Sequence, residues 1–223
     1  MEPRHILSDL SDNLLSMTDW NNKEEVLEEV REDGYELKKA SEELRADKEV
    51  VLAAVHINGD ALEHASKELR ADREVVMSGN RPVEDNEHYH NGKLLYASKE
   101  LRADREVVLN AIKDFGYNLQ HASKELRADK EVVMVALEVD GNALRFAHKE
   151  LRADKEVVMA ALESPSWGGF FHNGYALEYV SDELKADWEV VMTAIKSTGD
   201  ALGDASEELK NDPEFMKEVE QYL

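Results

Sequence analysis

The sequence predicts an all-α protein, a right-handed-type α-solenoid of about eight 25-residue helix-pair repeats. The motif ELRAD or a close variant recurs along the chain, and an apolar stretch of helical length follows each copy. Each expected helix has only about ten residues, which is too short to be stable alone in water. Successive units must therefore bury their apolar faces against one another, as units of a solenoid do.

The last residue of each ELRAD copy sets the register of the array. It falls at Asp47, Asp72, Asp104, Asp129, Asp154, Asp187 and Asp212. The steps between them are 25, 32, 25, 25, 33 and 25 residues, so two units contain insertions of seven or eight residues. Asn22 takes the same place one step earlier and adds an eighth register. We expect a capping helix over residues 1–21 and one solenoid over residues 22–223, with insertions near 78–91 and 164–173.

The unit that begins at Asp47 shows the expected elements in order. Asp47 is predicted to cap the first helix, because its carboxylate accepts the free amide hydrogens of the first turn. Gly59 is predicted to end that helix in a left-handed conformation, which glycine adopts without steric cost. A second helix is expected over residues 60–70. Its buried face should consist of Leu62, Ala65, Ser66 and Leu69.

The pattern also predicts how much of each helix is enclosed. Residues 50–55 are apolar on every side, which is typical of a helix enclosed by its neighbours, so the second helix should lie outside. At the two ends of the array, Glu25 stands where Val50 stands in its unit, and Lys217 stands at the position of Leu52. Terminal repeats need such polar outer faces.

The segments NGDALEHASKELRADREVVM and GYNLQHASKELRADKEVVMVAL resemble the repeat of the family known as domain of unknown function 4116. The resemblance covers about residues 22–220, and the motif recurs in register seven or eight times. It implies a tandem helical array. It implies no activity, cofactor or partner, and the two insertions are the main departure from an uninterrupted array.

Composition narrows the classes of partner. Lys and Arg number 27 and Asp and Glu 49, which gives a formal net charge of −22. Such a surface repels phosphate backbones and anionic headgroups, so we expect neither nucleic acid nor membrane as partner. The chain has no cysteine and no apolar run long enough to span a membrane. We expect a cytoplasmic protein that binds an unidentified protein with a basic or mixed surface.

Three sets of side chains recur at equivalent positions. Glutamates such as Glu43 precede basic residues such as Arg45 by two places, and we expect ion pairs between units, with a charged track for a partner as the alternative. A set of rings is expected to pack edge to face, with a recognition surface as the alternative. This set comprises His64, Tyr96, His121, Phe146 and Tyr179. The recurring serines, such as Ser66, have no unique basic partner, so we predict packing and local hydrogen bonds rather than nucleophilic catalysis.

The insertions break the repeat and therefore attract attention. Both follow the first helix of a unit and both end in His-Asn-Gly, so they should emerge on the same face of the solenoid. Large aromatic side chains are the anchors that interfaces favour, although the same rings could instead cover gaps between units. The predicted partner-binding residues are Tyr89, Trp167, Phe170, Phe171 and His172.

The sequence favours a non-enzymatic interaction or scaffolding module, with no catalytic residue, no metal ligand and no cofactor assigned. A metal-dependent enzyme that uses His88 and His90 is one alternative, because nearby carboxylates complete a loose ligand set. An acidic mimic of nucleic acid is another, since a rod of this charge could occupy a DNA-binding cleft.

Overall fold

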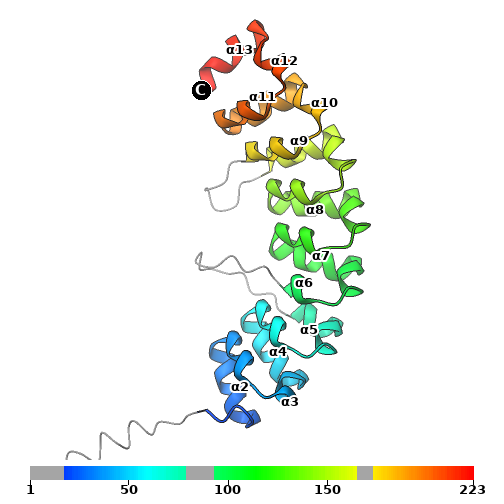
Figure 1. Cartoon of the computed structure of the whole chain (residues 1–223), viewed down its shortest axis with the longest axis vertical. Helices are drawn as coiled ribbons and strands as arrows, with labels where there is room; N and C mark the ends of the chain where they lie inside the picture. Colours follow the sequence, from blue (N-terminus) through cyan, green and yellow to red (C-terminus); the bar gives the residue numbers. More distant parts are fainter. Residues whose placement is uncertain (1–17, 79–92, 165–172) are drawn as a thin grey trace, which may run out of the picture.

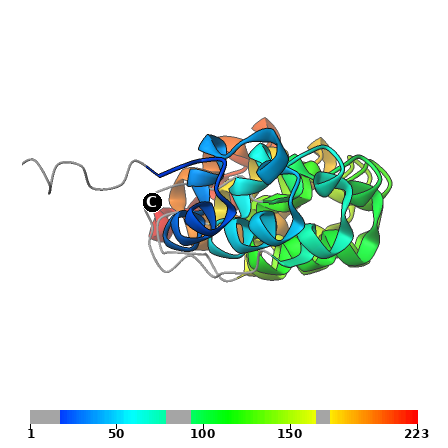
Figure 2. The same cartoon turned by 90° about the horizontal axis from the view of Figure 1, so that it is seen from below.

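The helices follow one another in a single curved stack, from α2 at one end to α13 at the other (Figure 1). The computed structural model describes residues 18–78, 93–164 and 173–223, and these contain helices and turns but no strand. Seen along the stack, both ends lie on one side and the middle is displaced to the other (Figure 2). Successive units abut, as the solenoid prediction requires.

One layer of the stack, the α-layer, takes one longer helix from each unit. Its helices are α2 (Lys23–Glu32), α4 (Lys48–Ile57), α5 (Arg73–Ser78), α7 (Arg105–Asp114), α8 (Lys130–Val139), α9 (Lys155–Glu163), α11 (Trp188–Ser197) and α13 (Pro213–Val219). Asp47 Oδ1 accepts the Glu49 amide at 2.9 Å and the Val50 amide at 3.2 Å. The same two bonds form at Asn22, Asp104, Asp129, Asp154 and Asp212, whereas Asp187 accepts the Val190 amide. The predicted N-cap is confirmed.

The other layer, the return layer, consists of short segments that lead back to the next N-cap. The first segments are η2 (Gly34–Lys39), η3 (Gly59–His64), α6 (Lys93–Tyr96), η6 (Gly116–His121), η8 (Gly141–Phe146), η11 (Asn173–Tyr179) and η12 (Gly199–Asp204). The ELRAD turns that follow are α3 (Glu42–Arg45), η4 (Leu69–Ala71), η5 (Leu101–Ala103), η7 (Leu126–Ala128), η9 (Leu151–Ala153), α10 (Asp182–Lys185) and α12 (Glu207–Lys210). The chain ends in η13 (Glu220–Tyr222).

The prediction of a single second helix over residues 60–70 is wrong. Two short 3₁₀ segments replace it, and the backbone between them is extended at Ala65, with ψ 156°. The cause lies in the preceding unit, because the Ser66 amide donates to the Arg45 carbonyl at 2.8 Å instead of continuing a helix. Ser66 Oγ then accepts the Leu69 amide at 3.3 Å and caps the next turn.

The same backbone bond joins one unit to the next along the array. The amide–carbonyl pairs are Ser41–Trp20, Ser66–Arg45, Ser98–Arg70, Ser123–Arg102, His148–Arg127, Ser181–Arg152 and Ser206–Lys185, at 2.8–3.1 Å. The bond spans the units that contain the insertions, so the insertions leave the stacking register unchanged.

The left-handed conformation predicted for Gly59 is not adopted by the glycines at four equivalent positions. Gly34, Gly116, Gly174 and Gly199 all lie outside the left-handed region of φ. They are small for a different reason, because each lies against the next unit. A Cβ on Gly116 would lie 2.7 Å from the carbonyl oxygen of Ala136 in α8. The missing side chain therefore allows the two layers to approach closely.

Ion pairs form a second connection between units, but not between the residues expected. The first residue of α2, α4, α5, α7, α8 and α9 reaches the N-cap aspartate of the next unit. The pairs are Lys23–Asp47, Lys48–Asp72, Arg73–Asp104, Arg105–Asp129, Lys130–Asp154 and Lys155–Asp187, at 2.7–3.5 Å. We call them the cap ladder. In the described part of the chain, Glu43, Arg45 and their equivalents form no ion pair between units, so that prediction is wrong.

The α-layer is enclosed on one side and partly open on the other. Val50, Val51, Ala54 and Val55 are buried, whereas Leu52 and Ala53 are only half-buried. The expectation of a fully enclosed helix is therefore wrong, because the return layer covers just one face of the α-layer.

The predicted capping helix falls mainly on residues 1–17, outside the described residues. The next residues, Thr18 and Asp19, form hydrogen bonds with glutamates at the first end of the array. Thr18 Oγ1 donates to Glu29 Oε1 at 2.6 Å, and the Asp19 amide donates to Glu25 Oε2 at 2.7 Å. No helix in the described ranges is long and apolar enough to cross a membrane.

Candidate interaction surfaces

The predicted contacts Tyr89, Trp167, Phe170, Phe171 and His172 lie outside the described residues, as do His88 and His90 of the metal alternative. Across residues 18–78, 93–164 and 173–223, no three or more His, Asp and Glu side chains are grouped so as to hold a metal ion. The described residues instead present two surfaces, one on each layer.

The α-layer presents a stripe of half-buried apolar side chains. Its members stand five residues after successive N-cap aspartates, and we call them the methionine stripe. They are Leu52, Met77, Leu109, Met134 and Met159. One side of each packs on the core and the other side faces solvent. Methionine is flexible and polarizable, which suits it to contacts with varied apolar partners.

The stripe contains a hollow between α8 and α9. Its walls are formed by Met134, Leu137, Glu138, Ala160, Glu163 and Ser164. The floor is apolar, whereas Glu138 and Glu163 are exposed at the rim and form no ion pair within the described ranges. An apolar floor with an uncompensated acidic rim suits a side chain or helix with an apolar body and a positive end.

The rings of the return layer pack as expected where their contacts are described. His64 meets Tyr35 of the preceding unit at 6.0 Å and 64°, and Phe146 meets Tyr117 at 5.4 Å and 80°. The Arg145 guanidinium lies over both of the latter rings, 4.7 Å from Tyr117 and 4.5 Å from Phe146. Sequence reasoning missed the partner tyrosines, although each directly follows a recurring glycine.

Three rings of this layer have pKa values shifted in the direction that favours the neutral form. Burial lowers the pKa of the His64 imidazole. Burial, together with the nearby Glu63 carboxylate, raises the pKa of Tyr96 to about 12. A hydrogen bond with Glu178, followed by burial, raises the pKa of Tyr179. These directions suit packing and hydrogen bonding rather than proton transfer near neutral pH.

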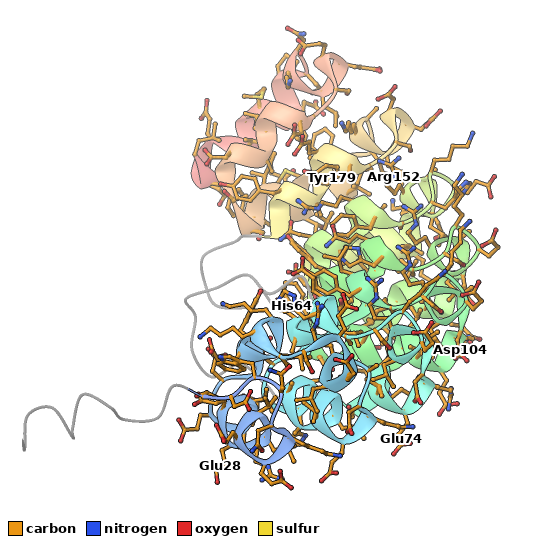
Figure 3. The ribbon with its side chains drawn as sticks, turned by 60° about the horizontal axis from the view of Figure 1, so that its bottom comes forward. Glu28, His64, Glu74, Asp104, Arg152 and Tyr179 are labelled. Atoms are coloured by element: carbon orange, nitrogen blue, oxygen red, sulfur yellow. The ribbon has the colours of Figure 1, made fainter. Side chains whose placement is uncertain are left out.

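One half-buried arginine lies in each of the first five ELRAD turns, and we call this set the arginine row. It comprises Arg45, Arg70, Arg102, Arg127 and Arg152. The Nε atom of every member is buried without a hydrogen-bond partner. Arg152 Nη1 donates to the Tyr179 carbonyl at 3.1 Å, and the two residues lie side by side in Figure 3. Arg45 shares a shallow hollow with His64 of the next unit.

The arginine row and the acceptors of the cap ladder lie in different places. Asp104 of the cap ladder and Glu74, which also pairs with Lys48, lie at one border of the array, away from His64, Arg152 and Tyr179 (Figure 3). The cations of the cap ladder are thus used in stacking. The arginine row is not part of that ladder.

These features define a helical repeat protein whose candidate sites are surfaces formed jointly by successive units. The family model "Domain of unknown function (DUF4116)" matches residues 22–70, 47–78, 89–127, 129–167, 170–210 and 187–219. The chain belongs to this family, and the resemblance seen in its repeats is confirmed. No curated protein and no solved structure matches the chain.

Proposed function

We propose that the protein is a non-enzymatic interaction or scaffolding module whose α-layer binds a segment of another protein. The hollow between α8 and α9 carries this proposal, because its floor is apolar and its two rim carboxylates have no ion-pair partner among the described residues. A ligand side chain that fills the hollow gains binding free energy by burying apolar surface. A positive charge on that side chain gains further by pairing with the rim carboxylates.

The partner that fits best is a basic amphipathic helix. The methionine stripe runs along the α-layer and offers a row of half-buried apolar contacts, as helix-binding grooves do. The net charge of −22 attracts basic segments and repels nucleic acid and anionic membranes. A basic or mixed protein surface is therefore the proposed partner class, with contact inside the cytoplasm.

The second insertion belongs to this proposal because of its place in the chain. Ser164 is part of the hollow, and Trp167 follows three residues later. Three residues of chain span at most about 10 Å, so the length of the chain permits a contact between Trp167 and a ligand in the hollow. We propose Trp167, Phe170, Phe171 and His172, with Tyr89 of the first insertion, as further contacts on a right-handed solenoid of about eight units.

The test is binding of a labelled amphipathic Leu/Lys helix, measured by fluorescence anisotropy. Glu138→Gln with Glu163→Gln should weaken binding about threefold to thirtyfold, since exposed pairs contribute up to about 1 kcal/mol each. Glu208→Gln with Glu218→Gln removes the same charge from exposed positions elsewhere and serves as the matched control. Trp167→Ala measures the contribution of the insertion separately.

Equal binding by the rim variant and its control would refute the hollow as the binding site. Stoichiometric zinc, iron or manganese in the purified protein would favour the metal-dependent alternative centred on His88 and His90. Binding to a basic DNA-binding protein that DNA competes away would favour nucleic-acid mimicry instead.

A further inference from the structure

The ELRAD turns of the four middle units carry a second cation. A lysine stands three residues before the arginine, whereas Glu42, Asp182 and Glu207 occupy that place in the outer units. The cation pairs are Lys67–Arg70, Lys99–Arg102, Lys124–Arg127 and Lys149–Arg152, and we call them the basic band. The Arg70 amide donates to the Ser66 carbonyl at 3.0 Å, so Lys67 and Arg70 share one helical turn, and residues three apart on such a turn are neighbours.

Among the described residues, Arg152 is the one member of the basic band whose side chain bonds to another unit, at the Tyr179 carbonyl. Within the described ranges, its lysines and Arg70, Arg102 and Arg127 form no ion pair or hydrogen bond through their side chains. The lysines are exposed. Stacking is instead supplied by the cap ladder and by the backbone bonds between units.

The arginine side chains of the basic band are partly buried, but their hydrogen-bonding capacity is not fully used. Each Nε is buried without a partner, while the terminal nitrogens of Arg70, Arg102 and Arg127 are not among the buried atoms that lack a partner. Burial of part of the side chain restricts the guanidinium, so less freedom is lost when an anion binds. In two outer units the equivalent lysines are already occupied, since Lys185 and Lys210 donate to the carbonyls of Glu178 and Gly203 at 2.8 and 2.7 Å.

The glutamate carboxylates in the same turns are also partly engaged in hydrogen bonds or close contacts. One glutamate accompanies each pair, at Glu68, Glu100, Glu125 and Glu150. Hydrogen bonds from its own amide and from the turn serine lower the pKa of Glu100, and the same bonds act on Glu125. His148 lies 3.9 Å from Glu150. Eight cations thus accompany four carboxylates, which leaves the band positive within a strongly acidic protein.

We infer that the basic band binds an extended acidic segment of a polypeptide. Packed helices lie about 8–10 Å apart, and an extended chain advances about 3.3–3.6 Å per residue. An acidic side chain on every third residue therefore matches one turn per unit, and its carboxylate accepts both terminal N–H groups of a guanidinium. Nucleic acid matches less well, because the acidic remainder of the molecule repels its continuous phosphate charge.

The inference concerns the return layer and does not depend on the proposed function of the α-layer. The test uses a fluorescent peptide of about twelve residues with Glu at every third position and Gly or Ser between. A second peptide of equal composition has its glutamates clustered at one end. Binding is measured by anisotropy on the full chain at low and raised salt. The spaced peptide should bind more tightly, and salt should weaken its binding.

Arg70→Gln with Arg102→Gln and Arg127→Gln should weaken binding of the spaced peptide on the order of tenfold to a hundredfold. The control Lys113→Gln with Lys196→Gln and Lys217→Gln removes the same charge from exposed positions outside the band and should change it less than about threefold. Arginine-to-lysine substitution of the same three residues keeps the charge and should give an intermediate loss, because the bidentate geometry is gone.

A second variant covers the case in which the arginine variant unfolds. Lys67→Gln with Lys99→Gln and Lys124→Gln changes only exposed side chains and should weaken the spaced peptide several-fold. The rim variant at Glu138 and Glu163 should bind this peptide as the unmodified protein does, which separates the two surfaces.

Three results would overturn the inference. One is no binding of the spaced peptide to the unmodified protein at low salt. Another is equal binding of the spaced and clustered peptides, or equal binding by the basic-band variants and the charge-matched control. The third is tighter binding of an oligothymidine of equal charge than of the peptide, which would identify the band as a nucleic-acid surface.

Discussion

Substituting Gly116 with alanine tests the close approach between the two layers. The new Cβ would lie 2.7 Å from the Ala136 carbonyl oxygen and 3.3 Å from the Cβ and amide nitrogen of Asp140. These are backbone atoms or their direct neighbours, so no flexible side chain can move aside. The Ala136 carbonyl also accepts the Asp140 amide at 2.9 Å, which fixes its direction at the end of α8.

Gly203 supplies the matched control. It lies in η12, its φ is not left-handed, and a Cβ there would meet nothing within 4 Å. Alanine at such a site stabilises by about 0.4–1 kcal/mol, because the unfolded chain loses more freedom than the folded one. At Gly116 the same gain is set against overpacking, which costs about 1–3 kcal/mol. Gly116→Ala should therefore destabilise by about 1–2 kcal/mol, while Gly203→Ala stabilises.

The measurement is urea unfolding followed by circular dichroism, together with hydrogen exchange of the amides of α8. Exchange reports the local interface, which matters because the stability of a repeat array is a sum over neighbouring units. Faster exchange in α8 in Gly116→Ala alone is expected. If both substitutions shift the urea midpoint in the same direction, the close approach at Gly116 does not limit the side chain and the reasoning is wrong.

Three further predictions test the connections between units. A hydrogen bond from Lys130 lowers the pKa of Asp154. The pair therefore stabilises the folded protein above the ordinary carboxylate pKa of about 4, and this stabilisation is lost as the pH falls further. Lys130→Gln should lower the urea midpoint at pH 7 but leave it unchanged near pH 2. Ser206→Pro, at φ −64°, keeps the backbone conformation but removes the amide bonded to the preceding unit, so it should lower the melting temperature more than Ser206→Ala, which removes only the hydroxyl cap. Trp188 packs on Phe215 at 5.0 Å, so Trp188→Ala should increase hydrogen exchange in α13 before the rest of the array unfolds.

The sequence predicts the features that depend on neighbouring residues. The N-cap at Asp47 accepts hydrogen bonds only from amides two and three residues later, so the sequence of a single unit is enough to predict it. Stacking of successive units follows from the short period and the apolar stretches, which no single unit can bury.

The return layer was harder to predict because its decisive bond is not local. The Ser66 amide bonds to Arg45, 21 residues earlier, and this ends the helix that local spacing favours. The cap ladder was missed for a similar reason. Lys48 and Asp72 are 24 residues apart, nearly one full period, whereas the spacing of Glu43 and Arg45 drew attention to residues in the same turn. A comparison of each first-turn cation with the next cap would have found it.

The candidate surfaces likewise differ in how far the sequence predicts them. The predicted contacts in the insertions fall outside the described residues, so they stay predictions. The methionine stripe is visible in the sequence once the units are aligned on their caps, but its partial exposure depends on which face the return layer covers. The unpartnered Nε atoms of the arginine row depend on burial and were not predictable from spacing.

The basic charges of each unit are divided by position between two tasks. The cation after the cap is bound to the next unit, and at Trp188 an aromatic contact with Phe215 replaces it. The exposed lysines of the ELRAD turns form no such contact within the described residues, so their removal should hardly change stability. Repetition alone explains why the arginine recurs, but it does not explain why Lys67 and its equivalents are confined to the middle units. A binding surface of limited length accounts for that confinement, because an extended ligand needs cations only where it lies.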